Sequence, residues 1–242
     1  MRIAALLLTL TLASSAFGGE IFIPATYRGP GAFGATWRTE ISVSNLSLST
    51  PVPIQTTITL HRVNAEPISI PMLLAQHEVI SVRDALRDWF GIEEGGGIVR
   101  VTWDDPNARI ATNARVYNLS SNGEFGQGIP GVRPERLLSE VFLPGLSGVD
   151  GNRTNIGISN PHNVDVIAWV TLHDTSGAVR GSIALGIPPR SYRQINDIFA
   201  FFNVGPFHAG MVRVSGFNTT IYAYASVVRN DTGDATYIAP AE

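Results

Sequence analysis

The chain has 242 residues, of which 44% are hydrophobic and only 15% are charged, and its formal net charge is −3. A weakly acidic chain with so few charges has no electrostatic attraction for nucleic acid or for an anionic membrane surface, so neither is an expected partner. The sequence contains no cysteine, which excludes disulfides, a lipid-anchored cysteine and thiol catalysis, and leaves stability to the hydrophobic core.

Residues 1–18 have the features of a signal peptide. Arg2 supplies a positive charge, Ile3 to Ala13 form an apolar run, and small residues allow cleavage after Ala16 or Gly18. The run is shorter than the roughly 20 residues that cross a bilayer, and no later stretch reaches that length. We therefore expect a secreted protein, extracellular or periplasmic, without a membrane span.

The remaining sequence predicts an internal duplication. The octet RTEISVSN at residues 38–45 returns as RTNIGISN at residues 153–160. Further blocks align in the same order: 20–24 with 140–144, 58–61 with 170–173, 81–86 with 194–199, 97–102 with 210–215, and 123–130 with 233–240. A period this long indicates a duplicated domain. We expect one domain at residues 19–130, a linker with a helical turn around Pro134 at residues 131–139, and a second domain at residues 140–242.

Within each repeat, apolar and polar residues alternate as they do in half-buried strands. Ile41 and Val43 alternate with serines, Val99 and Val101 with Arg100 and Thr102, and turn formers separate the runs. This spacing is typical of an antiparallel sandwich. Asp84 and Asp197 each precede an apolar run that ends at a glycine, which predicts one short helix per repeat. The expected fold is all-β, with two tandem Ig-like or jelly-roll sandwiches.

The letters RTNIGISNP (Arg153 to Pro161) and AYASVVRNDTGDAT (Ala223 to Thr236) carry a resemblance. They are similar to motifs that open and close tandem repeat modules in secreted proteins of environmental bacteria, which have no established activity. The resemblance covers the second repeat closely and the first more loosely, and it departs at Arg229, where the pattern has an acidic residue. It implies an exported β-sandwich and no particular reaction.

No motif predicts catalysis, a cofactor or a metal. The sequence lacks a GxSxG elbow and an HExxH motif, and its five histidines form no close pair. Asp150–Asn155 and Asn230–Asp234 have oxygen ligands in calcium-like spacing, but such Asp/Asn/Gly runs are also ordinary turns. Glu93-Glu94 and Asp104-Asp105 fit solvated loops better than a glycosidase pair, because neither recurs in the second repeat.

Exposed aromatic residues are the remaining binding signal. Tyr27, Phe33 and Trp37 lie in a glycine-rich segment of the first repeat and are candidates for a ligand-binding platform. Trp103 and Trp169 fall within alternating strands, so we expect both to pack inside.

The expected function is a non-enzymatic binding, adhesion or structural module at the cell exterior. The alternatives are a carbohydrate-binding module that uses the aromatic segment, and a hydrolase with an unrecognised site. The expected partners are a polysaccharide or another surface protein. Self-association through a strand edge such as Thr219 to Val228 is also open.

Two polar positions recur in both repeats. Arg38 and Asp84 correspond to Arg153 and Asp197 in the alignment. We predict that each Arg forms an ion pair with its Asp and joins strand to helix. The competing interpretation is that each Asp only caps its helix while the Arg faces solvent.

Overall fold

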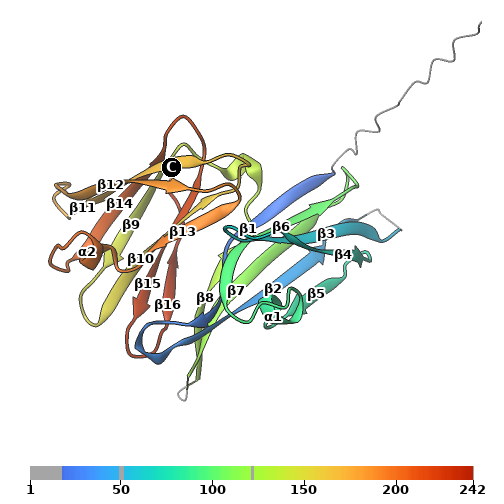
Figure 1. Ribbon diagram of the computed structural model, residues 1–242, viewed down its shortest axis with the longest axis horizontal. Helices are drawn as coiled ribbons and strands as arrows, with labels where there is room; N and C mark the ends of the chain where they lie inside the picture. Colours follow the sequence, from blue (N-terminus) through green and yellow to red (C-terminus); the bar gives the residue numbers. More distant parts are fainter. Residues whose placement is uncertain (1–17, 49–51, 121–122, 242) are drawn as a thin grey trace, which may run out of the picture.

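The computed structural model describes residues 18–48, 52–120 and 123–241 (Figure 1). The predicted signal peptide lies outside the described residues except for Gly18. The described chain is nearly all β-structure in antiparallel sheets, as the alternating pattern predicts. In this part of the chain, no helix has both the length and the apolar composition to cross a membrane.

The N-terminal half is a β-sandwich whose two layers share one strand. One layer has the order β4-β3-β6-β1 and the other has the order β5-β2-β7-β8. β1 pairs with β6 along most of its length and then with β2 at Gly29 and Pro30, which links the layers into one folded sheet. The strands are β1 (Gly19–Pro30), β2 (Thr36–Asn45), β3 (Ile54–His61), β4 (Ile68–Leu74), β5 (Val79–Val82), β6 (Gly95–Trp103), β7 (Ile110–Ser120) and β8 (Gly123–Pro130).

The C-terminal half has the same strand order in two separate sheets. β12-β11-β14-β9 corresponds to β4-β3-β6-β1, and β13-β10-β15-β16 corresponds to β5-β2-β7-β8. The strands are β9 (Glu140–Ser147), β10 (Asn152–Asn160), β11 (Val166–His173), β12 (Val179–Ile187), β13 (Ser191–Ile195), β14 (His208–Gly216), β15 (Tyr222–Arg229) and β16 (Ala235–Ile238). That the two halves arose by duplication stays a prediction from the sequence alignment.

Short helices occupy equivalent places in the two halves. α1 (Ala85–Asp88) and α2 (Ile198–Phe201) follow Asp84 and Asp197 directly. Their apolar residues Leu86, Ile198 and Phe199 are buried in the cores. The predicted linker contains a short 3-10 helix (Pro134–Arg136), so the expected turn at Pro134 is present.

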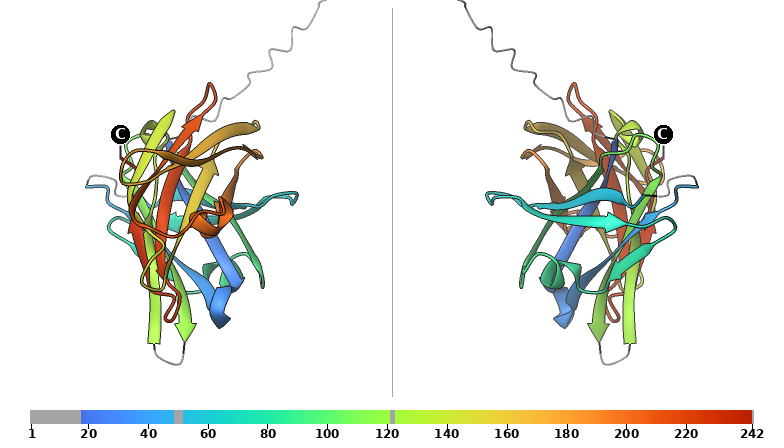
Figure 2. Two further views of the ribbon diagram at one scale, coloured as in Figure 1. Left: turned by 90° about the vertical axis from the view of Figure 1, so that its left-hand side faces the viewer. Right: turned by 90° about the vertical axis from the view of Figure 1, so that its right-hand side faces the viewer.

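Each half has its own hydrophobic core, but the first core also contains residues of the second half. Tyr222 and Tyr224 of β15 are buried in the N-terminal cluster, and Phe22 packs edge-to-face on Tyr222. The two sandwiches lie side by side, with the long β7–β8 hairpin extending beside β15 and β16 (Figures 1 and 2). The sheet β13-β10-β15-β16 therefore turns its outer face toward the first sandwich.

Two sequence predictions about strands are wrong. Trp103 is buried, but Trp169 is 48% exposed because its neighbours Ala168 and Val170 occupy the inward positions of β11. The segment from Thr219 to Val228 is not a free edge, since β15 pairs with β10 on one side and with β16 on the other. The outer strands of the C-terminal sheets are β12, β9, β13 and β16.

Candidate functional site

A cleft with a volume of about 720 Å³ lies between the two sandwiches. One wall is the outer face of the sheet β13-β10-β15-β16, and the other is formed by β1, the turn after it, β2 and the β7–β8 hairpin. Cavities of a few hundred to a thousand Å³ at a domain interface are the usual setting for a small-molecule site.

The C-terminal wall consists of alternating residues that point away from the second core. Because side chains alternate along a strand, β10 buries Thr154 and Ile156 and turns Arg153 and Asn155 to the cleft. The wall residues are Arg153 and Asn155 of β10, Tyr192 and Gln194 of β13, Asn196 and Asp197 beyond it, Tyr224, Ser226 and Val228 of β15, and Asn230 and Ala235. The wall is thus rich in amide and hydroxyl groups between aromatic rings.

Gly157 allows one of these rings to lie against the sheet. A Cβ atom at Gly157 would stand 2.3 Å from Tyr224 Cε1, closer than any carbon pair tolerates. Tyr224 can therefore cover the backbone of β10 and reach the first core, where it is buried.

The N-terminal wall contains the three aromatic residues that the sequence singles out. Tyr27, Phe33 and Trp37 all line the cleft. Thr39 Oγ1 accepts a hydrogen bond from Tyr27 N at 2.9 Å and donates one to Tyr27 O at 2.8 Å, which fixes the end of β1 against β2. Gly31 packs so closely on Trp37 that a Cβ would lie 2.2 Å from the indole Nε1. The glycine-rich segment thus holds the rings at the mouth of the cleft.

Two residues of the cleft have a left-handed backbone that is costly for their side chains. Phe33 has φ 57° and Asp197 has φ 46°. Phe33 is also 73% exposed, although burial would favour such a ring. Strained conformations of this kind concentrate at functional sites, where the surrounding structure holds them in place. Asn155 Oδ1 provides such support, because it accepts a hydrogen bond from Asp197 N at 3.0 Å.

The cleft contains a cation and an anion that do not form an ion pair. Arg153 Nη1 donates to Asn230 Oδ1 at 2.5 Å, and the Arg153 guanidinium lies 5.5 Å from the centroid of the Phe33 ring. Among the described residues, no group accepts a hydrogen bond from Nε or Nη2 of Arg153 or donates one to the carboxylate of Asp197, whose Oδ1 is buried. Burial lowers the pKa of Arg153, and the charge of Asp197 opposes that effect. The predicted Arg153–Asp197 pair is therefore wrong.

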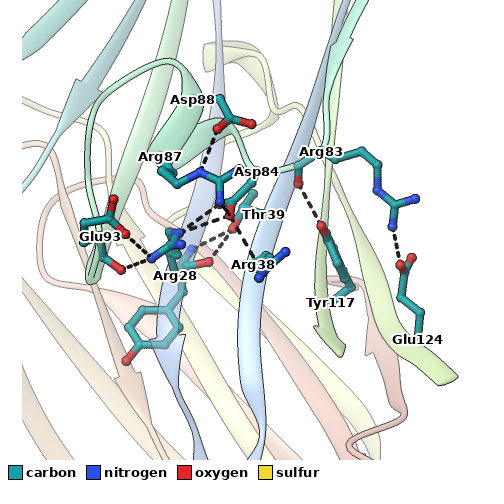
Figure 3. A network of polar contacts seen from close by, with 11 residues as sticks. Arg28, Arg38, Thr39, Arg83, Asp84, Arg87, Asp88, Glu93, Tyr117 and Glu124 are labelled. Atoms are coloured by element: carbon teal, nitrogen blue, oxygen red, sulfur yellow. Dashed lines mark hydrogen bonds and ion pairs between the residues drawn. The ribbon is translucent and has the colours of Figure 1, made fainter. Parts of the chain in front are cut away.

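The equivalent pair in the N-terminal half is formed. Arg38 Nε lies 3.5 Å from Asp84 Oδ2, as predicted, and Arg28 Nε lies 3.1 Å from Asp84 Oδ1 (Figure 3). Arg87 adds a third cation at 3.7 Å, and the Asp84 side chain is only 4% exposed. Arg28 also contacts Glu93 at 3.0 Å. Neither the Asp84 nor the Asp197 side chain accepts a capping hydrogen bond from a backbone N–H of its helix, so the capping interpretation is wrong for both.

The backbone differs at the two aspartates. Asp84 has φ −119° and ψ 63°, whereas Asp197 has a left-handed φ of 46°. Asn230 then provides the partner for Arg153. Continuing the alignment of 20–24 with 140–144 also places Gly148 opposite Arg28, so the second half lacks that cation. Equivalent positions thus stabilise the fold in one half and line the cleft in the other.

Burial keeps two tyrosines of the C-terminal wall, Tyr192 and Tyr224, in the neutral form. Burial raises the pKa of Tyr192 to about 12, and burial also raises the pKa of Tyr224. Tyr192 Oη donates to Thr26 O at 3.3 Å, which ties β13 to β1 across the interface. Ser226 Oγ donates to Gln127 Oε1 at 2.5 Å and makes a second tie. These bonds fix the two walls relative to each other.

The carboxylates of the acidic pairs and of the two calcium-like runs do not line the cleft, although Arg153, Asn155 and Asn230 of those runs do. Glu93 pairs with Arg28, and Asp105 Oδ1 accepts from Asn107 N at 2.8 Å within a turn. Asp231 pairs with Arg229 in the loop Asn230–Asp234, and Asn152 Nδ2 bonds Val149 O in the loop Asp150–Asn155. Within the described residues, no group of three or more His, Asp or Glu side chains is arranged to hold a metal ion.

The sequence pattern singles out the three aromatic residues of one wall, but of the other wall it singles out only Arg153 and Asp197, as an ion pair, and individual residues of calcium-like turns. The missed residues, such as Gln194 and Ser226, lie on the polar positions of alternating strands. That pattern normally indicates a solvent-facing surface, and only the packing of the two halves makes it a wall. Comparison of the chain with protein-family models, with curated proteins and with solved structures gives no match.

Proposed function

We propose that the protein is an exported, non-catalytic carbohydrate-binding protein whose site is the cleft between its two sandwiches. The observation that supports this most is the convergence of Tyr27, Phe33 and Trp37 on one cleft whose opposite wall is rich in amide side chains. Sugar rings have apolar faces that pack on aromatic rings and hydroxyls that need both donors and acceptors. An aromatic wall can pack on the apolar face of a sugar ring, and an amide wall opposite it can donate to and accept from the hydroxyls.

A binding role suits the cleft better than hydrolysis does. Glycoside hydrolysis ordinarily takes two carboxyl groups about 5–10 Å apart on either side of the bond. Among the described residues that line the cleft, Asp197 is the one carboxylate. A single carboxylate can orient a sugar but cannot supply both the acid and the base.

A glycan array tests the proposal. Residues 19–242, applied to neutral and acidic plant, fungal and bacterial polysaccharides, should bind at least one class. Trp37→Ala should then weaken that binding about 10-fold or more, because truncating a central aromatic contact commonly costs about 2 kcal/mol. Trp169→Ala is the matched control, since Trp169 is exposed on β11 and does not line the cleft. Failure to bind any glycan, or equal effects of the two variants, would contradict the proposal.

A second candidate is an adhesion or structural role through a protein partner. Ile167 and Trp169 lie on the outer face of β11, and Phe217, whose N–H donates to Ile167 O, is 63% exposed beside them. Exposed apolar residues grouped on a sheet face are typical of protein contacts. If this face mediates self-association, Trp169→Ser should shift the elution volume of concentrated protein toward the monomer; unchanged elution as a monomer would exclude that contact.

A further inference from the structure

The inference concerns Arg153 and Asp197 and rests on the proposed function, because it identifies the polar end of the same cleft. Arg153 is 9% exposed, and only its Nη1 has a hydrogen-bond partner among the described residues. A guanidinium has five N–H donors, and charges removed from water are normally paired. Because Arg153 lines the cleft, its remaining donors are available to a ligand there.

Asp197 is the complementary group, with a carboxylate that lacks a hydrogen-bond donor in the described part of the chain. Its carboxylate accepts no hydrogen bond from the described residues, and one oxygen is buried. A buried acceptor without a partner is destabilising, and so is the left-handed backbone at this residue. The structure therefore holds a strong donor and a strong acceptor on one wall, which interact electrostatically without forming an ion pair.

We propose that Arg153 and Asp197 bind adjacent hydroxyl groups of one uncharged sugar ring, with Arg153 donating to a hydroxyl oxygen and Asp197 accepting a hydroxyl hydrogen. Each sugar hydroxyl can donate and accept at once, so a pair of neighbouring hydroxyls satisfies both side chains. Asn230 holds the guanidinium and Asn155 holds the backbone of Asp197, so both groups are fixed before a ligand enters. The aromatic rings of the other wall would cover the apolar face of the sugar.

The charges of the cleft favour a neutral sugar over a uronic acid. Arg153 and Asp197 are the charged residues among those described as lining the cleft, and their formal charges cancel. A uronate carboxylate could bind Arg153 but would be repelled by Asp197. A pair of hydroxyl groups is not repelled by Asp197, and it gives both Arg153 and Asp197 a hydrogen-bond partner.

Calorimetric titration of residues 19–242 tests this inference with defined probes. The probes are cellohexaose, laminarihexaose and mannohexaose as neutral sugars, and hexagalacturonate as the acidic sugar. At least one neutral hexaose should bind, and it should bind about 10-fold or more tightly than hexagalacturonate. Asp197→Asn and Arg153→Gln should each weaken that binding by about 10-fold to 100-fold, because hydrogen bonds to charged groups contribute about 1.5–3 kcal/mol. Asp197→Asn should also reduce the ratio of the affinity for the neutral hexaose to the affinity for hexagalacturonate.

Two charge-removing substitutions outside the cleft serve as matched controls. Arg193→Gln and Asp165→Asn remove the same charges from exposed positions outside the cleft and should leave the affinity unchanged. If Trp37→Ala abolishes binding while Asp197→Asn and Arg153→Gln do not weaken it, the inference is overturned and the proposed function stands. Tighter binding of hexagalacturonate overturns the inference as well. If no neutral hexaose binds the wild-type protein, the inference is overturned, and the proposed function fails with it only if the glycan array is also silent. If Trp37→Ala has no effect on binding, both fail.

Discussion

Asp84 and Asp197 occupy equivalent positions in the two halves but have different surroundings. Asp84 lies among Arg28, Arg38 and Arg87 and is almost fully buried. The Asp197 carboxylate accepts no hydrogen bond from the described residues, and Asp197 lines the cleft. Removing one partner of a buried ion pair is costly because it leaves the other charge unpaired, whereas removing an unpartnered acceptor is not.

Asp84→Asn should therefore lower the free energy of unfolding by about 3 kcal/mol, and Asp197→Asn should change it by less than about 1 kcal/mol. For a protein of this size, the first change corresponds to a fall in Tm of about 6–12 °C. Both substitutions keep the side-chain shape, and asparagine tolerates the left-handed backbone at position 197. Thermal denaturation of the two variants measures the difference; equal melting temperatures would contradict the assigned roles.

The free energy of unfolding should depend on pH because the pKa of His61 differs between the folded and unfolded chain. Burial lowers its pKa to about 4, with a smaller effect from the nearby cations Arg190 and Arg100, and its Nε2 is buried without a partner among the described residues. Between pH 6.5 and 4 the unfolded chain binds a proton at His61 and the folded chain does not, so this group destabilises the fold as the pH falls through that window.

His61→Gln should remove that part of the pH dependence. Urea titrations at several pH values should show the wild type losing stability relative to the variant as the pH falls from 6.5 toward 4. His77→Asn, a change at an exposed loop residue, is the control and should follow the wild type. A constant difference between wild type and His61→Gln over the whole range would show that His61 does not titrate in this way.

At the scale of elements, the sheet β13-β10-β15-β16 depends on a glycine for its packing. Tyr224 lies over Gly157 of the neighbouring strand and reaches the core of the other half. The sheet therefore supplies both the cleft wall and part of the interface between the sandwiches.

Gly157→Ala should lower the free energy of unfolding by about 1–3 kcal/mol, because the added methyl group would displace the Tyr224 ring. Gly186→Ala is a matched control on β12, where an added Cβ meets no atom within 4 Å. It should leave the stability unchanged or raise it slightly, since alanine restricts the unfolded chain more than glycine does. Chemical denaturation distinguishes the two; an unaffected Gly157→Ala protein would mean that Tyr224 does not need this close approach.

The strands and short helices could be predicted from the sequence because alternation and turn residues act locally. Alternation also predicts two faces for each strand. On β11 the inward face is that of Ala168 and Val170, so the expectation that Trp169 packs inside is wrong. The aromatic wall was accessible to sequence reasoning because Tyr27, Phe33 and Trp37 are close in the chain. The opposite wall was not, because Asn155, Gln194 and Ser226 come together only when β10, β13 and β15 pair and face the other half.

The cleft exists only because the two sandwiches of the molecule pack together. Tyr192 bonds Thr26, Ser226 bonds Gln127, and Asn118 Nδ2 donates to Thr232 O at 3.2 Å, each across the interface. Neither half alone contains both the aromatic wall and the pair Arg153 and Asp197. Two halves with one strand order thus form a single cleft with two unlike walls.

A crystal structure of residues 19–242 with the saccharide that binds most tightly on the array would show directly whether the cleft is the binding site. We expect electron density for a sugar ring in the cleft between Trp37 and Arg153, with its hydroxyls at hydrogen-bond distance from Asp197. Density for the bound saccharide over Trp169, or anywhere else outside the cleft, would contradict this expectation.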